Sequence, residues 1–112
     1  MPNGFRNMNL MSKYFKETGT KTQIVGVFYG ESAHLTLNDK AYNEARNVTT
    51  GNPYKGLIAD LISQGIHIEE CAVAMKNHHW VNDDLLPGVK VNSGALVRLV
   101  QLVQQGYVQI QP

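Results

Sequence analysis

The run from Gln23 to Tyr29 constrains the fold more than any other part of the sequence, because β-branched and aromatic residues follow one another with only Gly26 between them. A strand with one face in water alternates apolar and polar residues, whereas a strand covered on both faces is apolar at nearly every position. The run therefore predicts a strand inside a parallel sheet, and such a sheet needs helices on both of its faces.

Several other segments have the apolar spacing of helices that bury one face. They are residues 7–16, 41–45, 57–62 and 96–103, together with a helix that begins at Ala72. Asn38 or Asp39, Asn52 and Ser93 precede three of these segments and are predicted to cap them. Gly19, Gly65 and Gly106 follow three of them, at positions where helices commonly end.

Strand patterns occupy the gaps between these helices. Ile66 to Ile68 alternates apolar and polar residues and runs into Cys71, residues 89–91 form a short apolar run, and residues 107–110 alternate again as a last strand. Strands and helices alternate without a repeat or a linker, and 112 residues suit one core. We therefore expect a single α/β domain over residues 1–112 with a parallel or mixed sheet between helices.

The balance of charged residues indicates which classes of partner the protein can bind. Ten Lys and Arg residues against nine Asp and Glu residues leave a formal net charge of +1. Nucleic-acid-binding domains usually carry a basic stripe, so no nucleic-acid partner is expected. A weakly charged surface repels its own copies little, which favours self-association.

The sequence also gives few signs of a targeting signal or of a disulfide bond. Cys71 is the single cysteine, which excludes an intrachain disulfide. No apolar run approaches the roughly 18 residues of a membrane span, so no membrane partner is expected. The polar start, residues 1–4, is unlike a signal peptide. We expect a cytoplasmic protein, or a periplasmic one if the chain is part of a longer precursor.

Cys71 is the strongest nucleophile of the chain, and its predicted place is the end of a strand at the start of a helix. Ligands and chemistry gather at the carboxyl ends of strands in such sheets, and helix N-termini favour a thiolate. Glu69 and Glu70 precede it and oppose that charge. Free cysteines are also often buried as small apolar residues. The sequence leaves both interpretations open, a reactive thiol and an inert one.

Two basic residues could assist Cys71. His34 follows the turn at Gly30 and would form a Cys/His pair if the fold brought it close, although the sequence favours an exposed loop histidine. Lys76 lies five residues beyond the cysteine.

The sequence supports no metal or cofactor site. His78 and His79 are adjacent and point apart in either a helix or a strand, and their spacing from Cys71 matches no standard zinc motif. The turn after Tyr29 lacks the glycine fingerprint of a phosphate-binding loop. We expect neither a metal nor a cofactor.

Eight short segments, in this order and spacing, resemble the DsrE/DsrF-like family of small sulfur-relay proteins from about Asn3 to Pro112. They are Val27-Phe28-Tyr29-Gly30-Glu31, Leu37-Asn38-Asp39-Lys40-Ala41-Tyr42, Asn52-Pro53, Gly65-Ile66-His67-Ile68, Cys71, Asp84-Leu85-Leu86-Pro87-Gly88-Val89-Lys90-Val91, Ser93 and Gln104-Gln105-Gly106-Tyr107.

The resemblance implies a three-layer α/β/α fold with a mostly parallel sheet of about four to five strands. It further implies a homo-oligomer (dimer, trimer or hexamer) and, in sulfur-oxidising members, a cysteine that holds sulfur as a persulfide. Cys71 matches that cysteine. The leading hypothesis is sulfur binding or transfer on Cys71 between a donor and an acceptor protein, at most a carrier or transferase activity. The alternative is a non-catalytic binding or assembly module with a structural cysteine.

Members of the family usually begin with a strand before the first helix. We therefore expect that the chain either lacks this N-terminal strand or is part of a longer protein chain. The lack would leave the backbone of a sheet edge unpaired, which a partner subunit could cover.

Overall fold

Three parallel strands form the sheet of the computed structural model, which describes residues 3–111. They are β1 (Val25–Phe28), β2 (His67–Glu70) and β3 (Lys90–Val91), hydrogen-bonded in the order β1-β2-β3. Glu70 lies beside Phe28 on one side and beside Val91 on the other, so the three carboxyl ends meet at one edge of the sheet. The predicted buried run is thus β1, and the predicted parallel sheet is confirmed.

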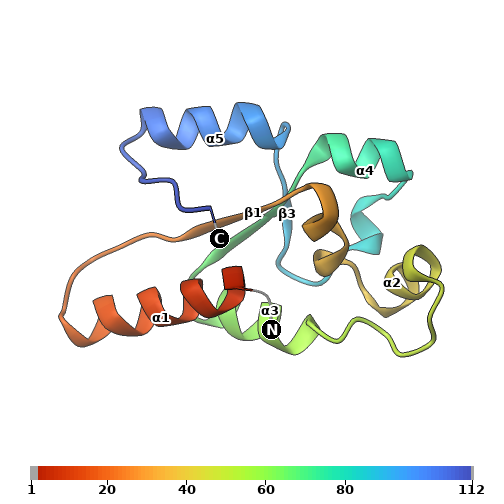
Figure 1. Ribbon diagram of the computed structural model, residues 1–112, viewed down its shortest axis with the longest axis horizontal. Helices are drawn as coiled ribbons and strands as arrows, with labels where there is room; N and C mark the ends of the chain where they lie inside the picture. Colours follow the sequence, from red (N-terminus) through yellow and green to blue (C-terminus); the bar gives the residue numbers. More distant parts are fainter. Residues whose placement is uncertain (1–2, 112) are drawn as a thin grey trace.

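Helices pack on both faces of this sheet, as the resemblance implied (Figure 1). α1 and α3 lie on one face, and α4 and α5 lie on the other. The helices are α1 (Asn3–Glu17), η1 (Gly30–Thr36), α2 (Asp39–Arg46), α3 (Lys55–Ser63), α4 (Ala72–His78), η2 (Asn82–Asp84) and α5 (Ala95–Gln104), where η marks a 3₁₀ helix. Within residues 3–111, no helix combines the length and the apolar character that crossing a bilayer requires.

The larger core lies between the sheet and the layer of α1 and α3. The ring of Phe5 lies 5.7 Å from that of Phe28 and 5.7 Å from that of Tyr54, centroid to centroid. Ile58 of α3 and Ile68 of β2 are fully buried beside them. Burying a side chain of this size stabilises a fold by about 2 kcal/mol, so this layer holds β1 and β2 firmly.

Gly26 interrupts the apolar run of β1 for a steric reason. A Cβ atom at this position would lie 3.0 Å from the Met8 sulfur and 3.3 Å from a methyl group of Ile68. The helix α1 can approach the strand closely because no side chain stands between them.

A smaller core lies beyond the carboxyl ends of the strands. It consists of Leu37, Ala41, Met75 and Leu85, which come from four different segments of the chain. An isolated antiparallel bridge joins Leu37 to Leu85. This cluster fixes α2 and α4 beside the edge of the sheet at which Cys71 lies.

Of two predicted helix N-caps, one is confirmed and the other is wrong. Asn38 caps α2, since its side-chain oxygen accepts a hydrogen bond from the Ala41 amide at 3.0 Å. Ser93 does not cap α5, because the N-cap residue is Gly94 and no side chain of that residue can accept a bond.

The prediction that Asn52 caps the following helix is wrong, because α3 begins at Lys55 with Tyr54 as its N-cap. The side chain of Asn52 is buried and donates to the carbonyl groups of Leu35 and Leu37 at 2.9 and 2.6 Å. Its oxygen accepts from the Tyr54 amide at 2.9 Å. Asn52 therefore ties the start of α3 to the end of η1.

The prediction of a last strand over residues 107–110 is wrong, because the chain is irregular there. Val108 and Ile110 are 86% and 57% exposed, so their alternation buries neither side chain. Alternation produces a strand only where another strand pairs with it, and this segment is held by a hydrogen bond of 2.6 Å from the Tyr107 hydroxyl to Gln23. Residues 3–111 thus form a three-stranded sheet rather than the expected four to five strands.

Within residues 3–111, no strand pairs with the outer edge of β1. A groove of about 1290 Å³ runs along this edge between α1 and α5. Lys21 and Glu31 are the charged residues of its lining. In parallel pairing, alternate residues of β1 point their N–H and C=O groups toward β2, so those of Val25 and Val27 face the groove.

Candidate functional site

Cys71 directly follows the central strand of the sheet and is the N-cap residue of α4. Its amide donates to the Phe28 carbonyl of β1 at 3.0 Å, which continues the β1–β2 ladder by one residue. The residue is buried, with 5% of its surface exposed. The predicted location, at the carboxyl edge of the sheet and the start of a helix, is confirmed.

The sulfur of Cys71 also contacts the first residue of α5. The Ala95 amide donates to Sγ across 3.3 Å. Ala95 is the first residue of α5, so its amide is one of the N-terminal donors that have no partner within the helix. Gly94 has φ = +126°, a conformation that side-chain-bearing residues rarely adopt, and the turn that aims the amide at the sulfur depends on it. The arrangement places Sγ at the positive end of the α5 dipole.

An ion pair holds α5 in this position. Arg98 of α5 donates to both carboxylate oxygens of Glu69, with the shortest contacts at 2.8 Å. Asn92 donates to the same carboxylate at 3.2 Å and accepts from the Gly94 amide at 2.9 Å. Two-point contacts of this kind fix orientation as well as distance, so β2 determines where the helix begins.

The side chain of Glu70 lies on the face of β2 opposite to that of Glu69, in the core. Its side chain is 0% exposed. One carboxylate oxygen accepts from the Thr36 hydroxyl at 2.6 Å, and the other accepts from the Cys71 amide at 3.1 Å. Burial raises the pKa of Glu70 from its usual 4.5 to about 7, although both hydrogen bonds act in the other direction.

His34 lies on η1 and belongs to a different cluster. Its ring centroid is 5.1 Å from that of His78 and 5.1 Å from that of Trp80, and His78 and Trp80 stack at 4.4 Å. Partial burial lowers the pKa of His34 below its usual value, and the positive charge of Arg46 adds to this effect. In the described part of the chain, no hydrogen bond joins His34 to Cys71.

Lys76 is exposed on α4, beyond the buried Met75. Among residues 3–111, neither Lys76 nor His34 forms an ion pair or a hydrogen bond with the Cys71 site. The structure thus gathers Glu69, Glu70 and the start of α5 around the cysteine instead of the two basic residues that the sequence suggested.

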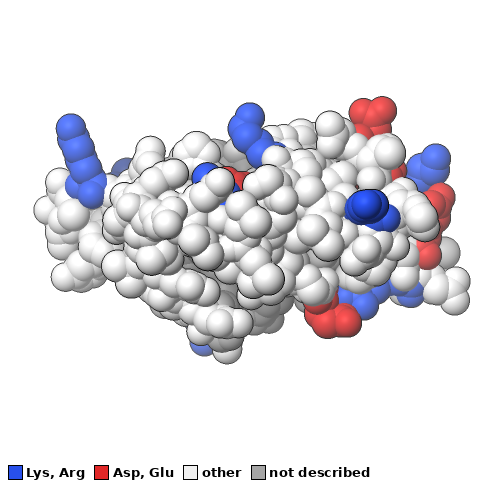
Figure 2. Space-filling view, turned by 90° about the horizontal axis from the view of Figure 1, so that it is seen from above, with Lys and Arg blue, Asp and Glu red and all other residues white. Residues whose placement is uncertain are grey.

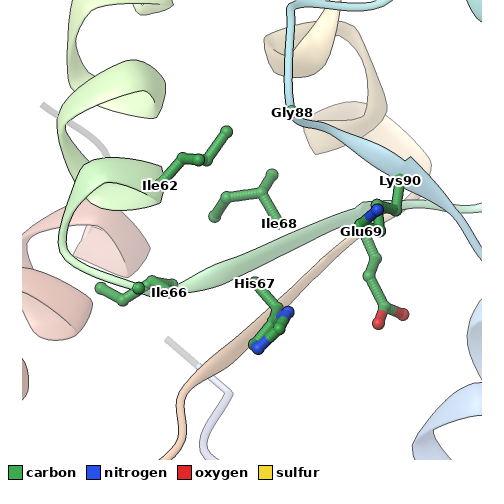
Figure 3. Close-up of a pocket in the computed structure, with 8 residues that line it drawn as sticks. Ile62, Ile66, His67, Ile68, Glu69, Gly88 and Lys90 are labelled. Carbon is green, nitrogen blue, oxygen red and sulfur yellow. The ribbon is translucent and has the colours of Figure 1, made fainter.

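A small hollow of about 180 Å³ lies at the other end of β2 (Figure 3). His67 and Glu69 point to one side of the strand there, and Ile66 and Ile68 point toward α3. Cys71 does not line this hollow. In the described residues, no group of three or more His, Cys, Asp or Glu side chains is arranged to hold a metal ion.

Sequence reasoning missed Thr36 and the part played by Glu70. The signal for Glu70 was present, because the alternation that buries Ile66 and Ile68 puts residue 70 on the same face. Thr36 carries no such signal, since it ends a 3₁₀ helix and reaches Glu70 across 34 positions of sequence.

Comparison with known proteins bears on the family and the fold of the chain. The model of the DsrE/DsrF-like family matches residues 3–112. A solved structure of a protein of unknown function, MTH1491 from Methanobacterium thermoautotrophicum, is similar with a TM-score of 0.70 and 22% sequence identity, covering 92% of this chain and 85% of that one. No curated protein matches the chain. The similarity to MTH1491 supports the fold, and the family match over nearly the whole length shows that the chain belongs to the DsrE/DsrF-like family.

Proposed function

We propose that this protein binds or relays sulfur as a persulfide on Cys71. The observation that carries the proposal is the hydrogen bond from the Ala95 amide to Sγ, which places the sulfur at the N-terminus of a ten-residue helix. Such a position stabilises a thiolate, and the thiolate is the nucleophilic form of cysteine. Membership of the DsrE/DsrF-like family supports the same chemistry.

The transfer step is a displacement at sulfur. The Cys71 thiolate attacks the terminal sulfur of a donor persulfide, R–S–SH, and a new S–S bond forms on Sγ. The S–S bond of the donor breaks, and its electron pair leaves with the donor as the thiolate R–S⁻. The terminal sulfur keeps its proton, so Cys71 becomes Cys–S–SH without any external oxidant. A thiolate of an acceptor protein reverses these roles and takes the sulfur away.

Loading with a persulfide donor tests this proposal directly. Mass spectrometry of the intact chain should show an adduct of about 32 Da, the mass of one sulfur atom, which reducing agents remove. The adduct should be absent from Cys71→Ser, and because Cys71 is the single cysteine its assignment needs no mapping. A wild-type chain that takes up no sulfur while the donor still loads a small thiol would contradict the proposal.

Two glycine variants separate the effect of the helix start from general strain. Gly94→Ala strains the turn that aims the Ala95 amide at Sγ, and Gly106→Ala strains the other end of α5, where φ is +96°. Neither new Cβ would collide with the chain, because the nearest atom to that of residue 94 lies at 3.5 Å and none lies within 4 Å of that of residue 106. We expect both variants to lose stability but only Gly94→Ala to lose sulfur loading.

A second candidate function follows from the burial of Cys71. With 5% of its surface exposed, the residue also fits a structural cysteine in a non-catalytic binding or assembly module. This alternative predicts that thiol reagents label the native chain no faster than its unfolding allows. It also predicts that Cys71→Ala binds the same partners as the wild type.

We further propose that the chain acts as a homo-oligomer, for which a dimer, a trimer and a hexamer are the candidates. Leu96, Val97, Val100 and Val103 of α5 are each more than half exposed. Figure 2 shows the face that carries α4 and α5, on which charged side chains are sparse. An uncharged apolar face can meet a second copy of itself without repulsion.

Light scattering after size exclusion tests this oligomer. The wild type should have a mass that is a multiple of 12.5 kDa, and Val100→Lys should shift it toward the monomer. Lys introduced at the exposed Gln101 is the matched control, because it adds the same charge to the same helix next to the apolar positions. A wild-type monomer at high concentration would contradict the proposal.

A further inference from the structure

The first turn of α5 covers the sulfur of Cys71. Cys71 and Ala95 are each 5% exposed, and the Ala95 amide lies 3.3 Å from Sγ. A donor protein must reach Sγ for the transfer step, so this cover has to move. We propose that α5 is a lid, whose first turn lifts off Cys71 at the Gly94 turn and admits the donor or the acceptor. The inference deepens the proposed function and rests on it for its biological use.

Little apolar packing holds α5 on the rest of the fold. Its buried side chains are those of Ala95 and Leu102. Among the described residues, neither the larger core nor the smaller core includes a residue of α5, and Figure 1 shows this helix on the face of the sheet opposite α1 and α3. Segments with few buried apolar contacts open at a lower free energy than the whole domain unfolds. The helix α5 can therefore leave the sheet while the larger core stays packed.

Polar contacts supply much of the hold that apolar packing does not. The Glu69 carboxylate accepts from Arg98 within α5 and from Asn92 just before the helix, and Asn92 accepts from the Gly94 amide. Hydrogen bonds weaken steeply when donor and acceptor lose their alignment, so a rotation of α5 breaks these contacts together. The Arg98–Glu69 ion pair thus acts as a latch that keeps the lid closed until the first turn moves.

Glycine residues lie at both ends of the lid. Gly94 precedes the first turn with φ = +126°, and Gly106 follows the last turn with φ = +96°. Glycine populates positive and negative φ about equally readily, so the backbone at both ends can change direction at low cost. When the first turn moves, the Ala95 amide leaves Sγ. The closed chain therefore shields the sulfur from solvent, and the open chain exposes it.

The rate at which iodoacetamide labels Cys71 in the native full chain tests the inference. Arg98→Met breaks the latch and keeps a long apolar side chain at the same position. We expect it to be labelled about tenfold faster than the wild type, because a hydrogen bond to a charged group contributes enough free energy to change an opening equilibrium by that factor.

Asn52→Ala is the matched control. Asn52 ties the start of α3 to η1, and its hydrogen bonds do not involve α5. The variant lowers the stability of the whole fold but leaves the latch in place, so its labelling rate should equal that of the wild type. If both variants were labelled faster in proportion to their loss of stability, global unfolding would be the only access and the inference would be overturned. Wild-type labelling as fast as that of a small free thiol would also overturn it.

A second measurement covers the case in which Arg98→Met does not fold. The labelling rate of the wild type is followed in urea below the unfolding transition. The effect of urea scales with the surface that an opening exposes, so the movement of one helix depends on urea only weakly. The rate should stay nearly constant at low urea and rise steeply near the transition. A steep rise from the lowest urea concentration onward would overturn the inference.

The outer face of α5 is also the surface proposed above for self-association. The labelling is therefore measured at a protein concentration at which light scattering gives the same mass for every variant. Neither readout uses a sulfur donor. Labelling through the lid in a chain that takes up no sulfur would contradict the proposed function alone. Sulfur uptake with labelling that follows global unfolding would contradict the lid alone.

Discussion

Glu70→Gln should make the chain more stable at pH 8 and remove much of the loss of stability between pH 4.5 and 7. In the wild type, burial raises the pKa of Glu70 from its usual 4.5 to about 7. The folded chain therefore binds this proton more tightly than the unfolded chain does. The stabilisation that comes with the proton is complete below about pH 4.5, declines as the pH rises, and is lost above about pH 7.

The expected change in the free energy of unfolding follows from the interval between the two pKa values of Glu70. Each pH unit between the two pKa values corresponds to about 1.4 kcal/mol, so the rise from 4.5 to about 7 costs the folded state about 3 kcal/mol at high pH. The glutamine side chain does not ionise, and it can accept from the Cys71 amide and donate to the Thr36 hydroxyl in place of the carboxyl group. The variant should gain most of this free energy at pH 8 and little at pH 4.5.

Urea unfolding followed by circular dichroism at several pH values measures this difference. The quantity to plot is the free energy of unfolding of Glu70→Gln minus that of the wild type, because the contributions of all other groups cancel. It should rise by about 3 kcal/mol from pH 4.5 to pH 8. The exposed Glu44→Gln is the control and should give a flat line. A flat line for Glu70→Gln as well would refute the reasoning.

Three further substitutions test the contacts that place the site. Asn52→Ala should destabilise the fold by about 3 kcal/mol, because it leaves buried backbone groups without partners, and the midpoint of urea unfolding should fall accordingly. Gly26→Ala should cost about 1–3 kcal/mol by colliding with the Met8 sulfur at 3.0 Å, and Met8→Ala in the same chain should recover part of that loss. Arg98→Met should cost about 2 kcal/mol by leaving the Glu69 carboxylate with only the Asn92 amide as a donor, and the double change with Glu69→Gln should be milder. Equal losses in the single and double variants would contradict each of the last two arguments.

The layered fold could be predicted because its signals are local. The apolar run at β1, the helix stripes and the turn glycines each act over fewer than ten residues, and their order along the chain specifies a parallel sheet between helices. The position of Cys71 followed from the same order. The same local reasoning wrongly predicted a last strand, because residues 107–110 have a strand pattern but, within residues 3–111, no strand to pair with.

The surroundings of Cys71 depend on contacts that are remote in sequence. Ala95 lies 24 positions from the cysteine, and Thr36 lies 34 positions from Glu70. Neither contact produces a pattern among neighbouring residues of the sequence. The sequence therefore suggested His34 as a partner of Cys71, but in the structure His34 packs against His78. A chemical partner of the cysteine that is inferred from residue type alone is thus a weaker prediction than a position that is inferred from the order of the strands.

The arrangement at the carboxyl edge is poor by the standard of stability, and this favours a chemical role for Cys71. The backbone at Gly94 has φ = +126°, which disfavours the oxygen-bearing residues that commonly cap helices, so no side chain caps α5 and its first amide contacts a sulfur atom. An apolar residue in place of Glu70 would avoid the cost of a carboxyl group in the core. A cysteine that only filled space would need neither feature. Local departures of this kind are expected where a site is built for reactivity, and both of them here lie in direct contact with Cys71, one at its amide and one at its sulfur.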